Sequence, residues 1–164
     1  MFREMRRKNQ QIPHEEAVQM LQRATSGVLA LSGDDGYPYA LPMSHLYQDG
    51  KLYFHCAADG HKIDAIRRCG KASFCVIAQD EVIEETFTTH FRSVIAFGRI
   101  RIMEDENEKR AAIAALAERF SPGRDSSREI EGSIRHMHML VMDIDHMTGK
   151  EAKELMMQRK EHAQ

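Results

Sequence analysis

The sequence has no tryptophan and only three cysteines among its 164 residues. Cys56, Cys69 and Cys75 form no CxxC pair and leave one cysteine over, which fits reduced thiols inside a cell better than a disulfide framework. No apolar run approaches the roughly 20 residues of a membrane span, and the polar segment 1–8 does not resemble a signal peptide. We therefore predict a cytoplasmic protein that interacts with no membrane.

A marked excess of charge of one sign is also missing. The formal net charge is -2 at pH 7, so no basic excess attracts nucleic acid phosphates. The hydrophobic share of 42% and the charged share of 29% are ordinary for one globular domain of this length. We predict a single domain over residues 12–158, with a flexible N-terminal arm at 1–11 and a C-terminal tail at 159–164.

Several motifs of known chemistry are absent. Neither GxGxxG nor GxxxxGK[ST] occurs, so the fingerprints of a Rossmann dinucleotide site and of a P-loop are both missing. His136 and His138 fall on one face of a predicted strand, but their spacing matches no zinc pattern, which favours no metal site. His55 and Cys56 are neighbours in a predicted strand and point to opposite faces, which argues against a cysteine hydrolase.

What the sequence does contain is a series of alternating apolar segments separated by turn signals. Strands are predicted at 28–31, 37–47, 52–57, 72–78, 91–103 and 137–144. Helices are predicted at 13–24, from just after Lys62 to Gly70 with Arg67 and Arg68 as cations at the helix end, from a capping box of Asp105 and Glu108 through Phe120, and weakly at 127–135. A hairpin turn is predicted at 33–36, an acidic loop at 79–85, and a turn at 146–149 before a C-terminal helix. The pattern predicts an α+β, mainly β fold: a six-stranded antiparallel barrel, closed or partly closed, with peripheral helices.

Two local features suggest a ligand. Pro38 and Pro42 cannot donate to a strand ladder, so one side of their strand must be an edge, a bulge or a wall that faces a ligand. Asp59-Gly60-His61-Lys62 lies between a strand and a helix, where backbone N–H groups and a lysine ammonium can hold a phosphate. Taken alone, this motif is also typical of a solvated loop.

A third feature is the polar start of the long strand. Thr88-Thr89-His90-Phe91-Arg92-Ser93 gathers hydroxyls, an imidazole and a guanidinium. Such donors suit the carbonyls of a planar cofactor, and an arginine stabilises negative charge on a reduced ring. Spacing alone equally favours a polar strand start exposed to water.

In order along the chain, several segments resemble the nitroimidazole-resistance branch of the pyridoxamine 5′-phosphate oxidase-like superfamily, whose fold is the FMN-binding split barrel. These segments are Gly36-Tyr37-Pro38-Tyr39-Ala40-Leu41-Pro42, Leu52-Tyr53-Phe54-His55-Cys56-Ala57, Gly60-His61-Lys62, Phe87-Thr88-Thr89-His90-Phe91-Arg92-Ser93-Val94, Phe97-Gly98-Arg99 and Asp145-His146-Met147-Thr148-Gly149-Lys150-Glu151-Ala152. The resemblance covers roughly residues 5–155. It implies a homodimer with FMN bound in two equivalent clefts, each built from both chains.

The resemblance also implies which residues contact FMN. The segment around 40–45 lines the isoalloxazine, the strand with His55 and Cys56 continues that wall, and Lys62 holds the phosphate. Related oxidases carry an arginine at the place of His61, which counts against pyridoxamine phosphate oxidase activity, whereas the nitroimidazole-resistance branch has a similar histidine. The predicted cofactor-binding residues are Leu41, Pro42, Met43, Ser44, His45, His55, Cys56, His61, Lys62, Arg92 and Ser93.

The function expected from this resemblance is that of an FMN-dependent oxidoreductase. Reduced FMN would pass hydride or electrons to a nitroaromatic compound or another small electron acceptor, with NADH or NADPH as the candidate donor. The alternative is a flavin or haem carrier without turnover, because His45, His55 and His61 surround the expected cleft. No catalytic acid or base is identified.

Overall fold

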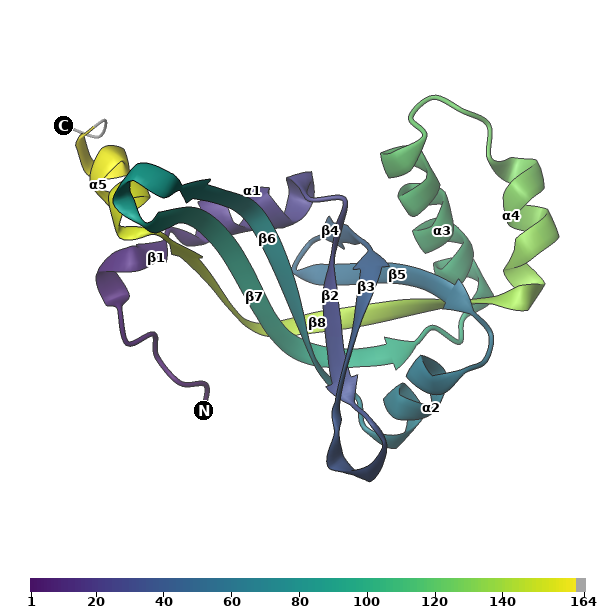
Figure 1. Ribbon diagram of the computed structural model, residues 1–164. Helices are drawn as coiled ribbons and strands as arrows, with labels where there is room; N and C mark the ends of the chain where they lie inside the picture. The colour runs from purple at the N-terminus through teal and green to yellow at the C-terminus, as the bar shows by residue number, and fades with distance from the viewer. Residues whose placement is uncertain (162–164) are drawn as a thin grey trace.

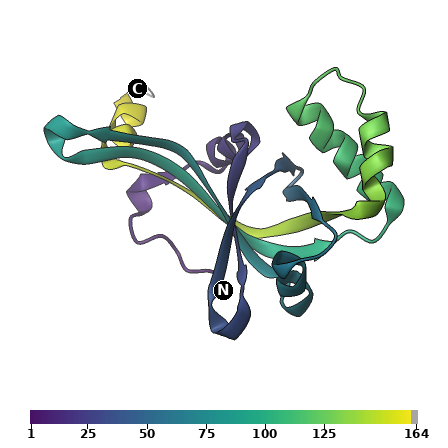
Figure 2. The ribbon, with the colours of Figure 1, turned by 45° about the vertical axis from the view of Figure 1, so that its right-hand side comes forward.

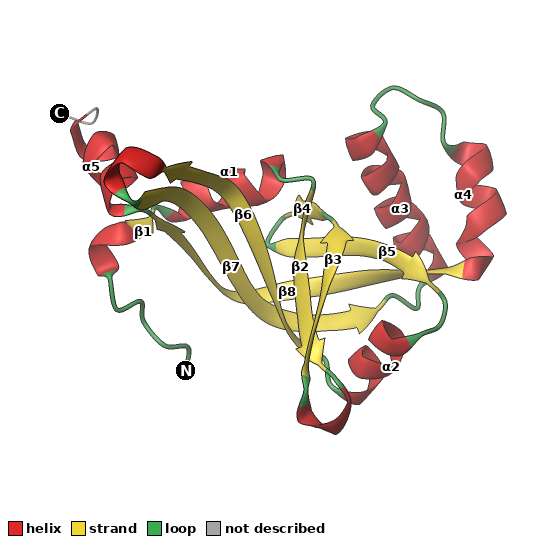
Figure 3. Cartoon of the chain, in the orientation of Figure 1, coloured by secondary structure: helices red, strands yellow, loops and turns green. Residues whose placement is uncertain are grey.

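A computed structural model describes residues 1–161 and contains eight strands and five α-helices (Figure 1). The strands are β1 (Gln11–Ile12), β2 (Ser26–Ser32), β3 (Pro38–Ser44), β4 (Leu46–Gln48), β5 (Lys51–Ala57), β6 (Lys71–Ile83), β7 (Thr88–Ile102) and β8 (Met137–Glu151). The helices are α1 (His14–Arg23), α2 (His61–Arg68), α3 (Glu106–Phe120), α4 (Ser127–Ser133) and α5 (Lys153–Glu161). Figure 3 shows the helices arranged around one continuous sheet.

All eight strands form one antiparallel sheet in the order β3-β2-β6-β7-β8-β5-β4, with β1 added on β8. The two end strands, β3 and β4, are separated in sequence by His45 alone, but they do not pair within the part of the chain that the structure describes. The barrel is therefore curled but not closed, which confirms the split-barrel prediction. The strand count exceeds the predicted six because β1 was missed and the segment 37–47 divides at His45.

The proline-marked strand β3 is the edge that its two prolines predict. It pairs only with β2 in the described sheet, with Pro42 opposite Val28 and Pro38 opposite Ser32. Because the free side of an edge strand needs no ladder partner, the missing N–H groups are tolerated there. On its other side, every residue of β3 pairs with β2, from Ser44 opposite Ser26 to Pro38 opposite Ser32.

The segment 79–85 was predicted as a loop, but only Glu84 and Glu85 lie in the 3₁₀ turn that joins β6 to β7, and the predicted turn at 146–149 is wrong because these residues continue β8. β6 continues to Ile83 and pairs with β7 from Thr88, so the two strands extend as a long hairpin arm (Figure 2). β8 continues to Glu151. Its pairing with β7 shifts register between Phe97 and Gly98, because Asp145 of β8 has no partner there. A Cβ on Gly98 would lie 2.0 Å from the Asp143 carbonyl oxygen, so the strands approach closely there.

Two apolar cores lie on opposite faces of the sheet. The larger one contains Leu29, Phe54, Phe74 and Leu140 and is covered by α1 and α2. The smaller one packs α3 on the other face of β8, where Met137, Met139 and Val141 alternate with residues of the larger core. The predicted N-cap of α3 is confirmed, since the Asp105 carboxylate accepts a hydrogen bond of 2.8 Å from the Glu108 N–H.

The two chain ends both contact β8. In the predicted arm, Lys8–Gln10 form a 3₁₀ turn and the Phe2 ring stacks on His146 at 4.8 Å. In the predicted tail, Arg159 belongs to α5 and donates to the fully buried Glu151 at 2.8 Å. Of that tail, 162–164 lie outside the described residues.

Candidate functional site

The candidate site begins at the first turn of α2. Gly60 precedes the helix with a φ of 109°, a left-handed conformation that favours glycine, and its carbonyl accepts from the Ile63 and Asp64 N–H groups. The first N–H groups of a helix have no acceptor within the helix. The backbone donors of His61 and Lys62 are therefore available to an anion, as the motif predicted.

The ammonium group of Lys62 points back toward the sheet. Its Nζ lies 4.0 Å from the Met43 sulfur on β3, and its side chain is half-buried. The charge of Lys62 also acts on Cys56 of β5: burial raises the pKa of this thiol, and the nearby ammonium partly offsets that rise. The structure thus brings together three predicted residues, Met43, Cys56 and Lys62, from three elements.

His61 is fixed against the β2–β3 turn. Its ring stacks on Tyr39 with 4.0 Å between centroids, and its Nε2 lies 3.3 Å from the Asp34 carboxylate. The same carboxylate pairs with Arg68 at 2.7 Å, near the end of α2. Sequence analysis missed Tyr39, Asp34 and Arg68 as parts of this site, because Asp34 was interpreted as a turn residue and Arg68 as a helix-ending cation.

His45 lies in the protein core and not on the surface. Its imidazole is fully buried, its Nε2 lies 2.8 Å from the Leu21 carbonyl oxygen, and its ring meets Phe74 edge-on. Burial lowers the pKa of His45, so the ring is neutral at pH 7 and Nε2 carries the proton that it donates. In this position the side chain joins α1 to the turn between β3 and β4.

His55 and Cys56 point to opposite faces of β5, as alternation predicted. Cys56 is buried on the side of Lys62 and pairs with His138 of β8. His55 is exposed on the other face, opposite Met139, and α3 packs on that face. The structure does not bring His55 together with Lys62.

Arg92 and Ser93 lie farther along the sheet, where the hairpin arm begins. Helix α2 and the residues after it meet β7 near the other end of that strand, where the Ile100 N–H donates to the Gly70 carbonyl oxygen. Arg92 and Ser93 precede Ile100 by seven residues or more, about 20 Å along a strand, so the chain does not bring them to Lys62. Arg92 forms an ion pair of 3.5 Å with Glu151, a contact too poorly aligned to be a hydrogen bond, and lines a cavity of about 450 Å³ together with Ser26 and Gln79.

The outer face of the sheet carries apolar side chains over several strands. Strand register aligns two rows across it: Pro42, Val28, Cys75, Ile95 and Thr148 in one, and Ala40, Ala30, Ser73, Phe97 and His146 in the other. We call these two rows the outer apolar face. Val28 is 41% exposed and Ile95 39%, which is unusual for apolar residues at the middle of a sheet.

The predicted residues of β3 therefore divide between two environments. Pro42 and Ser44 point to the outer side of the sheet, while Leu41 and Met43 point to its inner side, against the larger core. Chemically, the start of α2 can hold an anion, and the outer apolar face can contact a planar apolar ring.

Within residues 1–161, no helix combines the length and the apolar character needed to cross a membrane. The same residues contain no group of three or more histidine, cysteine, aspartate or glutamate side chains arranged to hold a metal ion.

Solved structures with a similar fold include three proteins at 19–22% sequence identity. One, from Bacteroides thetaiotaomicron, is described as a candidate 5-nitroimidazole antibiotic resistance protein; it has a TM-score of 0.75 and 22% identity over 85% of each chain. A FAD and haem binding protein from Mycobacterium smegmatis has a TM-score of 0.72 and 22% identity over 88% of this chain and 74% of that one. A flavocytochrome from Azotobacter vinelandii has a TM-score of 0.73 and 19% identity over 92% and 72%.

No curated protein sequence matches the chain. The sequence profile of the family described as pyridoxamine 5′-phosphate oxidase, in contrast, matches residues 13–151, which span the sheet from β2 to β8 and the start of α2. The open antiparallel barrel and this match agree with the resemblance found in the sequence. The chain belongs to the pyridoxamine 5′-phosphate oxidase family.

Proposed function

We propose that this chain is an FMN-binding oxidoreductase that works as a homodimer. The observation that carries the proposal is the environment of Lys62. Its half-buried ammonium faces Met43 and Cys56, and no carboxylate of the described residues lies within ion-pairing distance of it. A partly buried cation without an anionic partner is costly, and a bound phosphate would supply that partner.

The residues present fit a flavin phosphate. Lys62 would neutralise part of its charge, and the N–H groups of His61 and Lys62 at the start of α2 would donate to its oxygens. The contact of 3.3 Å between the His61 Nε2 and the Asp34 carboxylate holds the His61 ring at the start of α2, beside the proposed phosphate position. When bound, FMN supplies hydride and electron transfer, chemistry that the protein side chains do not provide themselves.

The separation of Lys62 from Arg92 and Ser93 supports the homodimer. Helix α2 meets β7 at its Ile100 end, whereas Arg92 and Ser93 lie toward its start, so a cleft that uses both groups needs Arg92 and Ser93 from a second copy. The outer apolar face is exposed between them and offers the surface on which a second copy and the flavin ring would pack. We therefore place the flavin between two chains.

The proposed reaction is reduction of a nitroaromatic compound or another small electron acceptor, with NADH or NADPH as the donor. The similar fold of the candidate 5-nitroimidazole resistance protein supports this substrate class. The FAD and haem binding protein and the flavocytochrome support redox cofactors on this fold. The chemistry of the acceptor depends on the shape of the pocket between the two chains.

A carrier without turnover remains the second candidate, and flavin is its favoured ligand. His45, His55 and His61, the histidines considered for haem, are directed to the core, to the α3 face and to Asp34 respectively. They do not line one common cavity, so they do not form a shared haem site.

The test is an absorption spectrum of the purified protein after incubation with FMN and removal of the unbound flavin. We expect retained flavin bands, bleaching by NADH or NADPH, and reoxidation by a nitroimidazole. Retained flavin without bleaching by either donor would identify a carrier. A colourless protein, or a haem Soret band in place of flavin uptake, would contradict the proposal.

A further inference from the structure

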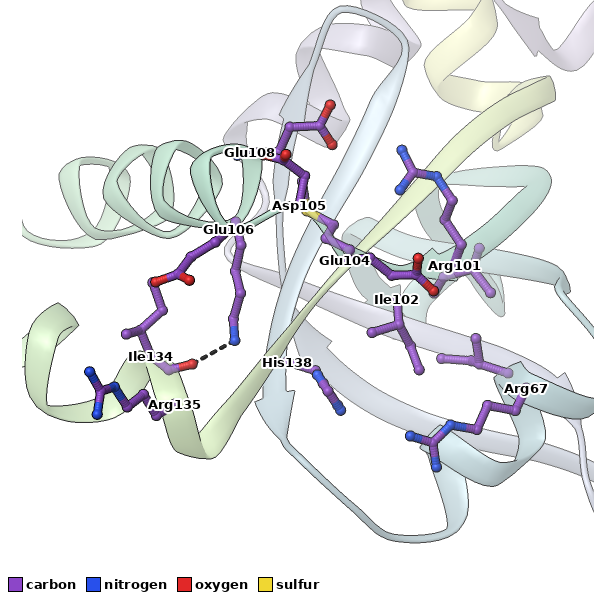
Figure 4. A pocket seen from close by; sticks show the side chains of 14 residues that line it. Arg67, Arg101, Ile102, Glu104, Asp105, Glu106, Glu108, Ile134, Arg135 and His138 are labelled. Atoms are coloured by element: carbon purple, nitrogen blue, oxygen red, sulfur yellow. Dashed lines mark hydrogen bonds between the residues drawn. The ribbon is translucent and has the colours of Figure 1, made fainter.

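A second cavity of about 950 Å³ lies at the other end of α2 (Figure 4). It is an open cleft lined by Ile66 and Arg67 of α2, the end of β7, the first turn of α3 and the start of β8. Arg67 follows Lys62 by five residues, which corresponds to about 7.5 Å along the helix axis. No residue of the proposed flavin-binding set lines this cavity.

Three nitrogen-bearing side chains form one wall of the cavity: Arg67, Lys109 and His138. Figure 4 shows the Arg67 guanidinium directed toward the side of His138. Lys109 is held in place because its Nζ donates to the Ile134 carbonyl oxygen at 2.5 Å, which leaves its positive charge without an anion. The only ion pair of Arg67 among the described residues is a long one, 3.9 Å, with the exposed Asp64.

His138 reports the positive potential of this wall. Burial lowers its pKa most, and the charges of Lys109 and then Arg67 lower it further. A hydrogen bond from the ring to the Ala58 backbone opposes this effect. The imidazole is therefore neutral at pH 7, and its remaining nitrogen can accept a hydrogen bond from a hydroxyl of a ligand or of a protonated phosphate. Its pairing with Cys56 fixes it at the end of the β5–β8 ladder, so its position does not depend on a loop.

The rest of the lining is apolar or acidic apart from two further arginines, Arg101 and Arg135. Ile66, Ile102 and Ile134 line the apolar part, and Figure 4 shows the Glu104 carboxylate near Ile102. Two further carboxylates have partners in the protein: Glu106 pairs with Arg110, and Asp105 caps α3. The Glu108 carboxylate, like that of Glu104, forms no ion pair among the described residues. The walls thus offer a cationic end, an apolar middle and the two carboxylates of Glu104 and Glu108.

We propose that this cavity binds a small organic phosphate, of which a nucleoside monophosphate is the simplest representative. Its phosphate would lie against Arg67, Lys109 and His138, since an arginine and a lysine together suit a dianion. Its apolar or aromatic body would pack on the three isoleucines, and a hydroxyl or amino group would donate to Glu104. This site is separate from the proposed flavin site and does not depend on it.

The test titrates FMN-saturated protein with AMP, followed by calorimetry and by the NMR signals of the His138 ring. We expect saturable binding and a shift of the His138 signals. Arg67→Gln, at a largely exposed position, should weaken AMP binding about ten- to a hundred-fold, because it removes one charge-assisted contact. Arg124→Gln, at an exposed position in the α3–α4 connection, is the matched control and should leave the affinity unchanged.

Two control ligands separate the contribution of the phosphate to the affinity from that of the apolar body. Adenosine should bind far more weakly than AMP, and inorganic phosphate should bind more weakly than AMP because it lacks the apolar body. Unshifted His138 signals at millimolar AMP, equal affinity in the Arg67 and Arg124 variants, or phosphate binding as tight as that of AMP would each overturn the proposal. If the protein takes up no FMN, the same titration on the flavin-free protein decides the question, so failure of the two proposals is distinguishable.

Discussion

The Lys62 ammonium lies 4.0 Å from the Met43 sulfur, in contact with the inner side of the edge strand β3. A thioether is only a weak acceptor, so this contact does not satisfy the charge of the ammonium. The helix start beside it adds the backbone N–H groups of α2 and the positive end of the helix dipole. The arrangement leaves a local excess of positive charge at a place where the sheet is open.

Replacing Lys62 by glutamine should weaken FMN binding about ten- to a hundred-fold, since a charge-assisted hydrogen bond contributes about 1.5–3 kcal/mol. Riboflavin, which has no phosphate, should bind the wild type and the variant alike. Quenching of flavin fluorescence measures both affinities. Lys160→Gln, at an exposed position of α5, is the control. An equal FMN affinity for Lys62→Gln and Lys160→Gln would remove Lys62 from the site.

The outer apolar face should be the dimer interface, and Ile95 is the β7 residue of its first row, between Cys75 and Thr148. Ile95→Glu would place a charge against the second copy, so sedimentation velocity should show a monomer that has lost its FMN. Met157→Glu changes an exposed apolar residue on α5 and should leave the assembly intact. A dimeric Ile95→Glu variant that keeps its flavin would show that the interface lies elsewhere.

Stability should fall as the pH is lowered, with His45 as one cause. The pKa of His45 in the folded chain lies below the ordinary value of 6.5, so the unfolded state binds more protons between those two pKa values. The contribution of His45 to the free energy of unfolding is therefore fully present above the unfolded pKa and is lost as the pH falls to the folded pKa. The lowered pKa of His138 adds a contribution to the free energy of unfolding with the same sign.

His45→Gln removes the titrating group while its amide can still donate to the Leu21 carbonyl. Urea unfolding midpoints measured between about pH 5 and 8 should depend less on pH in this variant than in the wild type. An unchanged pH dependence would show that His45 does not titrate on unfolding.

Gly98 and Gly132 should respond oppositely to alanine. A Cβ on Gly98 would lie 2.0 Å from the Asp143 carbonyl oxygen, which is backbone and cannot move aside freely, so Gly98→Ala should destabilise the fold by about 1–3 kcal/mol or more. A Cβ on Gly132 in α4 meets nothing within 4 Å, so Gly132→Ala should be neutral or stabilising by up to about 1 kcal/mol. Thermal unfolding midpoints of the two variants and the wild type measure the difference. An equal change of the midpoint in both variants would contradict the strand register at Gly98.

The sequence predicted the long strands because apolar alternation and proline positions are local signals. β3 at the edge and the Asp105 cap are examples. The acidic arm at 79–85 was missed because a two-stranded ribbon with both faces in water has little apolar alternation to detect. The segment 146–149 was missed because its pairing depends on the register shift opposite Gly98, a tertiary feature.

The candidate site was predictable only in part. The anion-binding start of α2 follows from Gly60, His61 and Lys62, since glycine and helix position are visible in sequence. The burial of His45 depends on Leu21, 24 residues earlier in the chain, and no local pattern reveals this contact. The cavity wall of Arg67, Lys109 and His138 likewise gathers residues from three elements.

The most direct test of the account is an equilibrium titration of the wild-type protein with FMN, followed by flavin fluorescence and by sedimentation of the same samples. The account predicts saturation at equal numbers of FMN molecules and protein chains, with the flavin sedimenting as part of a dimer. Absence of saturable FMN binding, or a folded monomer that retains FMN after dilution, would contradict it.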